Sequence, residues 1–110
     1  MTVYELKKFQ TEITYKDRKN IKDGCCLEDE NPESIHKFYD KETALKELDK
    51  YKPELRKLSG GSGSYFLVTE YAVEVYEADE DEEFVDGSDY YTIKFEWNEE
   101  TENIVIGVVQ

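Results

Sequence analysis

The sequence predicts an α+β protein in which an antiparallel sheet of about four to five strands carries one main helix on one face. Residues 65–77 and 90–97 alternate apolar and polar side chains with the two-residue period of a half-buried strand. Residues 41–52 instead place apolar side chains three and four positions apart, as in an amphipathic helix. Because short turns join the later segments, we expect their strands to be antiparallel.

The length of the chain favours one domain. The 110 residues are interpreted as a single domain, 1–110, which is large enough to form a core without a disulfide or a metal ion. Aromatic side chains make up 14% of the sequence, and nine of them are tyrosines. A disordered acidic chain would be poor in such residues, so we expect this chain to be folded.

The N-terminal third is expected to contain two strands and a loop. Residues 2–9 favour a first strand, although Leu6, Phe9 and Ile13 also fit a helix. Residues 16–32 are polar and contain Gly24 and Pro32, which is typical of a loop. Residues 35–39 are expected to form a short second strand.

The helix prediction starts at Asp40, whose carboxylate suits the N-cap position. An apolar stripe follows at Ala44, Leu45, Leu48 and Tyr51, and Leu55 and Leu58 extend it. Because proline inside a helix costs about 3 kcal/mol, we expect a break or kink at Pro53, or a short second helical turn that begins there. Residues 59–64 are rich in glycine and serine and are expected to be a flexible connector between the helix and the C-terminal strands.

The C-terminal half is expected to be a meander of long strands. In residues 65–77, one face of the strand is expected to lie towards the core. In residues 90–97, the pattern predicts one shared face for Tyr91, Ile93, Phe95 and Trp97. A polar turn and a final strand over residues 104–109 complete the meander.

Charge is distributed unevenly along the chain. Residues 1–64 carry 13 basic and 13 acidic side chains, whereas residues 65–110 carry one basic side chain, Lys94, and 14 acidic ones. The entire net charge of −13 therefore belongs to the C-terminal half. Direct binding to nucleic acid or to an anionic membrane is disfavoured there, and a basic protein is the partner that this charge would attract.

No motif for catalysis, cofactor binding or metal binding is found, and we expect a protein that is not an enzyme. The two cysteines, Cys25 and Cys26, are adjacent and cannot form an ordinary disulfide, which favours reduced thiols and a cytoplasmic location. His36 is the only histidine, so the chain lacks the four soft ligands of a structural zinc site. We expect no signal peptide, because residues 1–10 carry charges and no apolar run, and no apolar stretch of the sequence is long enough to span a membrane.

The stretch from Phe38 to Val85 resembles a known group of proteins. It combines a strand, the helix Lys41-Glu-Thr-Ala-Leu-Lys-Glu-Leu48, and the segments Tyr65-Phe-Leu-Val-Thr-Glu-Tyr71 and Tyr76-Glu-Ala-Asp-Glu-Asp81. It is similar to small uncharacterised acidic proteins of gut-dwelling Gram-positive bacteria, which are associated with mobile elements. The resemblance implies no activity for any residue and favours a role between a host and a mobile element.

Two functional interpretations follow from these observations. The first is a small protein-interaction module that performs no chemistry. The alternative is an acidic mimic of nucleic acid that inhibits a basic nucleic-acid-binding enzyme, as anti-restriction and anti-CRISPR proteins do, because ordered carboxylates can imitate the phosphates of DNA. Under either interpretation the candidate partner-binding residues are acidic: Glu70, Glu74, Glu77, Asp79, Glu80, Asp81, Glu82, Glu83, Asp86 and Asp89.

Overall fold

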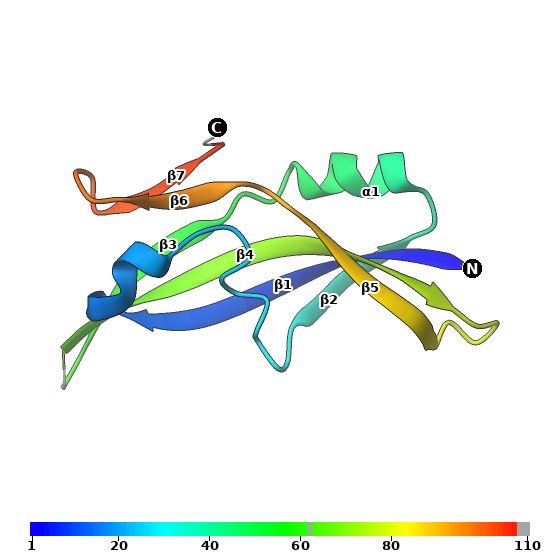
Figure 1. The fold of residues 1–110 in the computed structure, drawn as a ribbon, viewed down its shortest axis with the longest axis horizontal. Helices are drawn as coiled ribbons and strands as arrows, with labels where there is room; N and C mark the ends of the chain where they lie inside the picture. Colours follow the sequence, from blue (N-terminus) through cyan, green and yellow to red (C-terminus); the bar gives the residue numbers. More distant parts are fainter. Residues whose placement is uncertain (62, 108–110) are drawn as a thin grey trace.

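The computed structural model describes residues 1–61 and 63–107, and it shows a mostly β protein (Figure 1). One α-helix of 8 residues and one 3-10 helix of 6 residues are the only helices among the described residues. In chain order the elements are β1 (Thr2–Thr14), η1 (Tyr15–Asn20), β2 (Glu33–Phe38), α1 (Lys41–Leu48), β3 (Glu54–Gly60), β4 (Gly63–Ala78), β5 (Phe84–Thr92), β6 (Phe95–Asn98) and β7 (Asn103–Ile106).

Strand β4 is the centre of a five-stranded, strongly twisted antiparallel sheet with the order β2-β1-β4-β3. Strand β1 pairs along one edge of β4, from Thr2 opposite Glu77 to Thr14 opposite Tyr65. The other edge is shared, because β3 pairs with the first half of β4 and β5 with the second half. Strands β6 and β7 form a separate two-stranded sheet. The prediction of an antiparallel sheet is thus confirmed, and the first segment is a strand.

The main helix is shorter than predicted. It begins after Asp40, whose side chain accepts a hydrogen bond from the Thr43 backbone N–H at 2.9 Å, and it ends at Leu48. Residues 54–60, which include Leu55 and Leu58, are strand β3 and not a continuation of the helix. Pro53 lacks the backbone N–H that a helix needs, and pairing with β4 supplies hydrogen bonds to the backbone that follows.

The segment expected to be a connector between the helix and the sheet lies at the end of a hairpin. Ser59 pairs with Ser64, and Gly60 pairs with Gly63, so these residues end β3 and begin β4. Ser62 lies outside the described residues. The backbone pairing of β3 with β4 continues into the glycine-rich stretch, because this stretch connects the two strands and they are already in register.

Both faces of β4 are covered, although one core face was predicted. On one face Val73 packs with Leu6, Ala44 and Leu48, which places α1 over this side of the sheet. On the opposite face, the loop after η1 and strand β6 pack against the sheet and form a second cluster. Its buried members are Phe9, Ile21, Cys26, Phe66, Val68, Ala72 and Phe95. We call these two sides the helix face and the loop face.

The segment expected as one strand over residues 90–97 is broken. Strand β5 ends at Thr92 and β6 begins at Phe95. Tyr91 and Ile93 pack into the helix-face cluster, whereas Phe95 and Trp97 pack into the loop-face cluster. The prediction that these four side chains share one face is therefore wrong, because the chain crosses from one side of the sheet to the other between them. The final strand, predicted over residues 104–109, is β7, and residues 108–110 lie outside the described part.

Candidate functional site

Eight of the ten candidate acidic residues lie together at one end of the main sheet. They belong to residues 77–89, which form the end of β4, a turn and most of β5, and which we call the acidic hairpin (Figure 1). This segment contains no lysine, arginine or histidine. Seven of its acids are exposed and Glu82 is half-buried. The structure thus concentrates negative charge at one end of an elongated molecule of 48 × 31 × 19 Å.

Asp79 forms the turn of the acidic hairpin. Its side-chain Oδ1 accepts hydrogen bonds from the backbone N–H groups of Asp81 and Glu83, at 2.9 and 3.0 Å. Its backbone N–H donates to the Glu83 carbonyl at 3.0 Å. Aspartate is favoured in turns because its carboxylate bonds to backbone N–H groups nearby. The acidic side chain at position 79 therefore has a structural role in addition to its charge.

Several other acids of the hairpin are also held by internal contacts. Glu77 accepts a hydrogen bond from Thr2 and lies 3.8 Å from the N-terminal ammonium group, and Glu82 accepts one from the Tyr39 hydroxyl. Asp86 and Asp89 accept hydrogen bonds from the backbone N–H of the residue that follows each. Three side chains make no hydrogen bond or ion pair with the described residues, and we call them the free acids: Glu80, Asp81 and Glu83.

Exposed apolar side chains lie within the acidic hairpin and next to it. Phe84 is 59% exposed and Val85 60%, and both begin strand β5. Met1, which is 55% exposed, is joined to the hairpin by hydrogen bonds in both directions between its backbone and that of Ala78. Tyr39, which is 56% exposed, reaches it through Glu82. Large apolar side chains and free carboxylates therefore lie side by side at this end of the sheet.

Glu74, the ninth candidate, lies on the loop face and is half-buried. Its carboxylate pairs with Lys7 Nζ at 2.7 Å and accepts hydrogen bonds from Ser88 Oγ and the Tyr90 hydroxyl at 2.6 and 3.2 Å. Burial acts to raise the pKa of Glu74, but the hydrogen bonds from Lys7 and Ser88 outweigh it and hold the pKa below its usual range. Glu74 therefore connects β1, β4 and β5 and offers little charge to a partner.

Glu70, the tenth candidate, is 1% exposed and cannot contact a partner. Its Oε2 accepts a hydrogen bond from the Gly24 backbone N–H at 2.6 Å, and its Oε1 accepts one from Cys26 at 3.3 Å. Burial raises the pKa of Glu70 to about 7. The sequence contained a signal for this position, because Glu70 lies in phase with Phe66, Val68 and Ala72, all of which are buried on the loop face.

The structure keeps the cysteines and the histidine apart. Cys26 is buried in the loop-face cluster, and Cys25 packs against the same cluster. His36 lies on β2 opposite Leu6, which belongs to the helix-face cluster, and the centroid of its ring is 4.7 Å from that of the tilted Phe38 ring. Because these residues lie on opposite sides of the sheet, they form no Cys–His nucleophile pair. Within residues 1–61 and 63–107, no group of three histidine, cysteine or carboxylate side chains could hold a metal ion.

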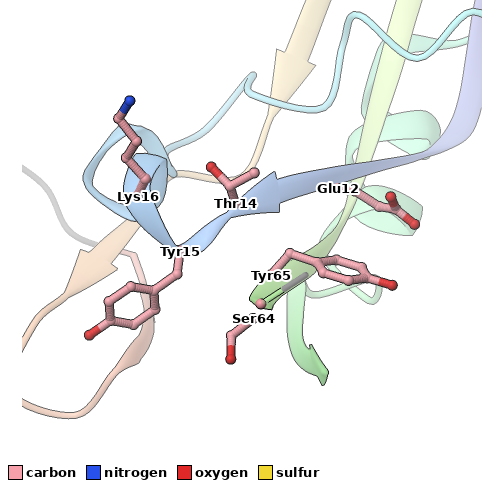
Figure 2. A pocket seen from close by; sticks show the side chains of 7 residues that line it. Glu12, Thr14, Tyr15, Lys16, Ser64 and Tyr65 are labelled. Atoms are coloured by element: carbon pink, nitrogen blue, oxygen red, sulfur yellow. The ribbon is translucent and has the colours of Figure 1, made fainter. Parts of the chain in front are cut away.

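A hollow of about 490 Å³ lies at the far end of the sheet, where β1 ends and β4 begins (Figure 2). Tyr15 and Tyr65 border it, together with Glu12, Thr14, Lys16 and Ser64. Figure 2 shows the ends of these side chains pointing in different directions rather than towards one point. Among the described residues, this hollow therefore has no set of converging polar groups that would orient a substrate.

The fold and the acidic hairpin define a small, mostly β protein with a charged and partly apolar surface at one end of its sheet. None of the described helices is both long and apolar enough to cross a membrane. Comparisons with protein-family models, with curated proteins and with solved structures find no match to this chain.

Proposed function

We propose that this protein is a non-enzymatic interaction module that docks its acidic hairpin on a basic protein surface. The observation that carries the proposal is the combination of three free acids with four exposed apolar side chains at one end of the sheet. Carboxylates at a rim steer a basic partner and set its orientation, while buried apolar anchors supply most of the affinity. Phe84 and Val85 are the anchors, and Glu80, Asp81 and Glu83 supply the charge.

The nucleic-acid mimic remains a prediction, but the structure gives it less support. A mimic needs an ordered series of carboxylates that are available to the partner. Glu70 is buried, Glu74 is paired with Lys7, and five of the other eight acids are engaged in internal contacts. The available charge forms a compact group at a hairpin end and not an extended row. We also propose a cytoplasmic location, which two free thiols support.

The proposal is tested by immobilising the full chain and quantifying the proteins that it retains from a lysate. The salt concentration is about 0.15 M, because the Debye length is then about 8 Å and attraction between more distant charges is largely screened. The test variant is Glu80→Gln/Asp81→Asn/Glu83→Gln, which removes the three free acids without breaking a hydrogen bond. The matched control is Glu96→Gln/Glu100→Gln/Glu102→Gln, which removes the same charge from exposed positions outside the hairpin.

We expect the test variant to lose at least about tenfold in retention of a specific basic protein, equivalent to about 1.4 kcal/mol, while the control retains it. The variant Phe84→Ser/Val85→Ser should lose that protein as well, at unchanged charge. If the test and control variants lose the retained protein to the same extent, its binding depends on net charge alone and not on the acidic hairpin. If the retained protein is a nucleic-acid-binding enzyme and duplex DNA displaces the chain from it, the mimic is supported instead.

A further inference from the structure

The loop that carries the two cysteines is held in a fixed conformation against the sheet. Cys25 N–H donates to the Lys22 carbonyl at 3.0 Å, and Asp29 N–H donates to the Cys26 carbonyl at 3.1 Å. On the side that faces the sheet, the buried carboxylate of Glu70 accepts hydrogen bonds from the backbone N–H groups of Gly24 and Cys26, the two neighbours of Cys25. These bonds fix the orientation of Cys25 relative to the sheet.

The two thiols differ in environment although their sulfur atoms are only 3.7 Å apart. Cys26 is 0% exposed, and its Sγ lies 3.2 Å from the Val68 carbonyl oxygen, to which it donates. Contact with Cys25 and burial raise the pKa of Cys26. Cys25 is half-buried, and its contact with Cys26 lowers its pKa. Since the thiolate is the reactive form, the more accessible Cys25 is the nucleophile of the pair, whereas Cys26 is buried and keeps its one proton on the bond to the Val68 carbonyl.

Cys25 opens into a hollow of about 580 Å³ between its loop, β1 and η1. The charged side chains that line this hollow are Glu12, Asp17 and Glu28, and all three are exposed. No lysine or arginine belongs to the lining. A cleft lined by one sign of charge raises the local concentration of small ions of the opposite sign.

We propose that Cys25 is a site of thiol–disulfide exchange, and that the acidic hollow in front of it selects small cationic disulfides over anionic ones. The Cys25 thiolate attacks one sulfur of the disulfide, the disulfide S–S bond breaks, and a new S–S bond joins Cys25 to one half. The other half leaves as a thiolate and takes up a proton from water. Cys25 is oxidised and the small disulfide is reduced, so the step needs no other oxidant.

Exchange stops at the mixed disulfide because Cys26 is a poor second nucleophile. An ordinary disulfide needs Cα atoms farther apart than the ~3.8 Å between neighbouring residues. The Cys26 sulfur is also buried and bonded to a carbonyl, which keeps it protonated. The product is therefore a chain with one small thiol on Cys25 and a free thiol on Cys26. This inference does not depend on the acidic hairpin, which lies at another part of the sheet.

The test uses the reduced full chain with three disulfides as probes: cystamine, which is cationic; 2-hydroxyethyl disulfide, which is neutral; and oxidised glutathione, which is anionic. Acid-quenched samples are peptide-mapped by mass spectrometry to give the rate at each cysteine. The test variant is Glu12→Gln/Asp17→Asn/Glu28→Gln. The matched control is Glu80→Gln/Asp81→Asn/Glu83→Gln, which removes the same charge from the acidic hairpin. Cys25→Ser defines the background.

We expect modification at Cys25 and not at Cys26, with cystamine favoured over oxidised glutathione. The test variant should reduce that preference at least about fivefold at about 0.1 M ionic strength, where the Debye length is about 10 Å. The control variant should leave it within about twofold, because the β1 residues of the hollow pair with residues 65–68, at the other end of β4 from the hairpin. Equal labelling of both cysteines, an internal Cys25–Cys26 disulfide as the main product, or the same preference in the test and control variants would each overturn the proposal. The site of modification and the preference for cystamine over oxidised glutathione are both measured in the wild type, so these two results do not depend on the folding of a variant.

Discussion

The carboxylate of Glu70 on β4 accepts a hydrogen bond from the backbone N–H of Gly24 at 2.6 Å, although the two residues are 46 positions apart. This bond, with the one from Cys26, attaches the loop after η1 to the loop face of the sheet. Because the acceptor of these bonds is a carboxyl group, which can be protonated, and not a backbone carbonyl, the attachment of the loop depends on pH. An acidic residue that the sequence placed on a partner-binding surface is thereby part of the core.

Glu70 should make the stability of the protein fall as pH rises. Burial raises its pKa from the ordinary 4.5 to about 7. Between these two values the unfolded chain has released the proton and the folded chain retains it, so the free energy of unfolding decreases through this window. Since one pKa unit corresponds to about 1.4 kcal/mol, the decrease is about 3 kcal/mol.

Urea unfolding of the wild type and of Glu70→Gln at a series of pH values measures this effect. Other carboxylates titrate equally in both proteins, so the difference between the two curves isolates Glu70. We expect the wild type to lose stability relative to the variant from about pH 4.5 to about pH 7. Two curves that stay parallel across this range would contradict the prediction.

Lys7→Met should destabilise the protein by about 2 kcal/mol, because it leaves the half-buried carboxylate of Glu74 without its cation. The two side chains are 21% and 13% exposed and 2.7 Å apart, and the pair joins β1 to β4. The matched control is Lys46→Met, which breaks the exposed pair with Glu42 and should cost at most about 0.5 kcal/mol. Chemical denaturation gives both values, and equal costs would show that burial of the pair is unimportant.

Asp40→Ala should cost about 1 kcal/mol because it removes the N-cap of α1. Both the backbone N–H and the hydroxyl of Thr43 donate to this carboxylate at 2.9 Å. Asp40→Asn is the control, since its amide oxygen can still accept the backbone bond and asparagine caps as well as aspartate. Thermal unfolding should rank the wild type and Asp40→Asn together above Asp40→Ala. A similar loss in both variants would mean that charge rather than capping matters.

Gly87→Ala should cost about 1 kcal/mol, because residues with a Cβ pay this much in the left-handed region. Gly87 has φ of 74° in the middle of β5, and an added Cβ would meet nothing within 4 Å, so the cost comes from the backbone alone. Gly61→Ala is the control, because its Cβ would also meet open space and its φ lies outside that region. Circular dichroism during urea unfolding compares the two, and no difference between them would exclude backbone strain.

Local patterns predicted the elements whose signals are local. The helix started where Asp40 offers a cap, and alternation over residues 65–77 predicted the long strand β4. The charge map, read from the sequence alone, predicted an acidic surface that the structure places at one hairpin. These predictions succeeded because capping, side-chain alternation and charge act over a few residues.

Predictions failed where the partner of a segment decides its state. Leu55 and Leu58 fit both a helix and a strand, and β4 selects the strand by offering a free edge. In the sequence, Tyr91 and Phe95 fit one face of an alternating strand. The sheet has a core on each side, however, and Tyr91 packs into the helix-face cluster while Phe95 packs into the loop-face cluster. A period of two shows that a strand has two faces and does not show which of them is covered.

The amino-acid pattern alone indicates that this chain is rich in strands, that it contains a capped helix near residue 40, and that its net negative charge lies after residue 64. Which carboxylates face water depends on tertiary packing, because the burial of a side chain is set by what packs above its strand. Glu70 and Glu80 have the same chemistry, yet the loop that carries the cysteines covers the first, whereas the second is exposed. The surface and the thiol site both follow from that difference in long-range packing.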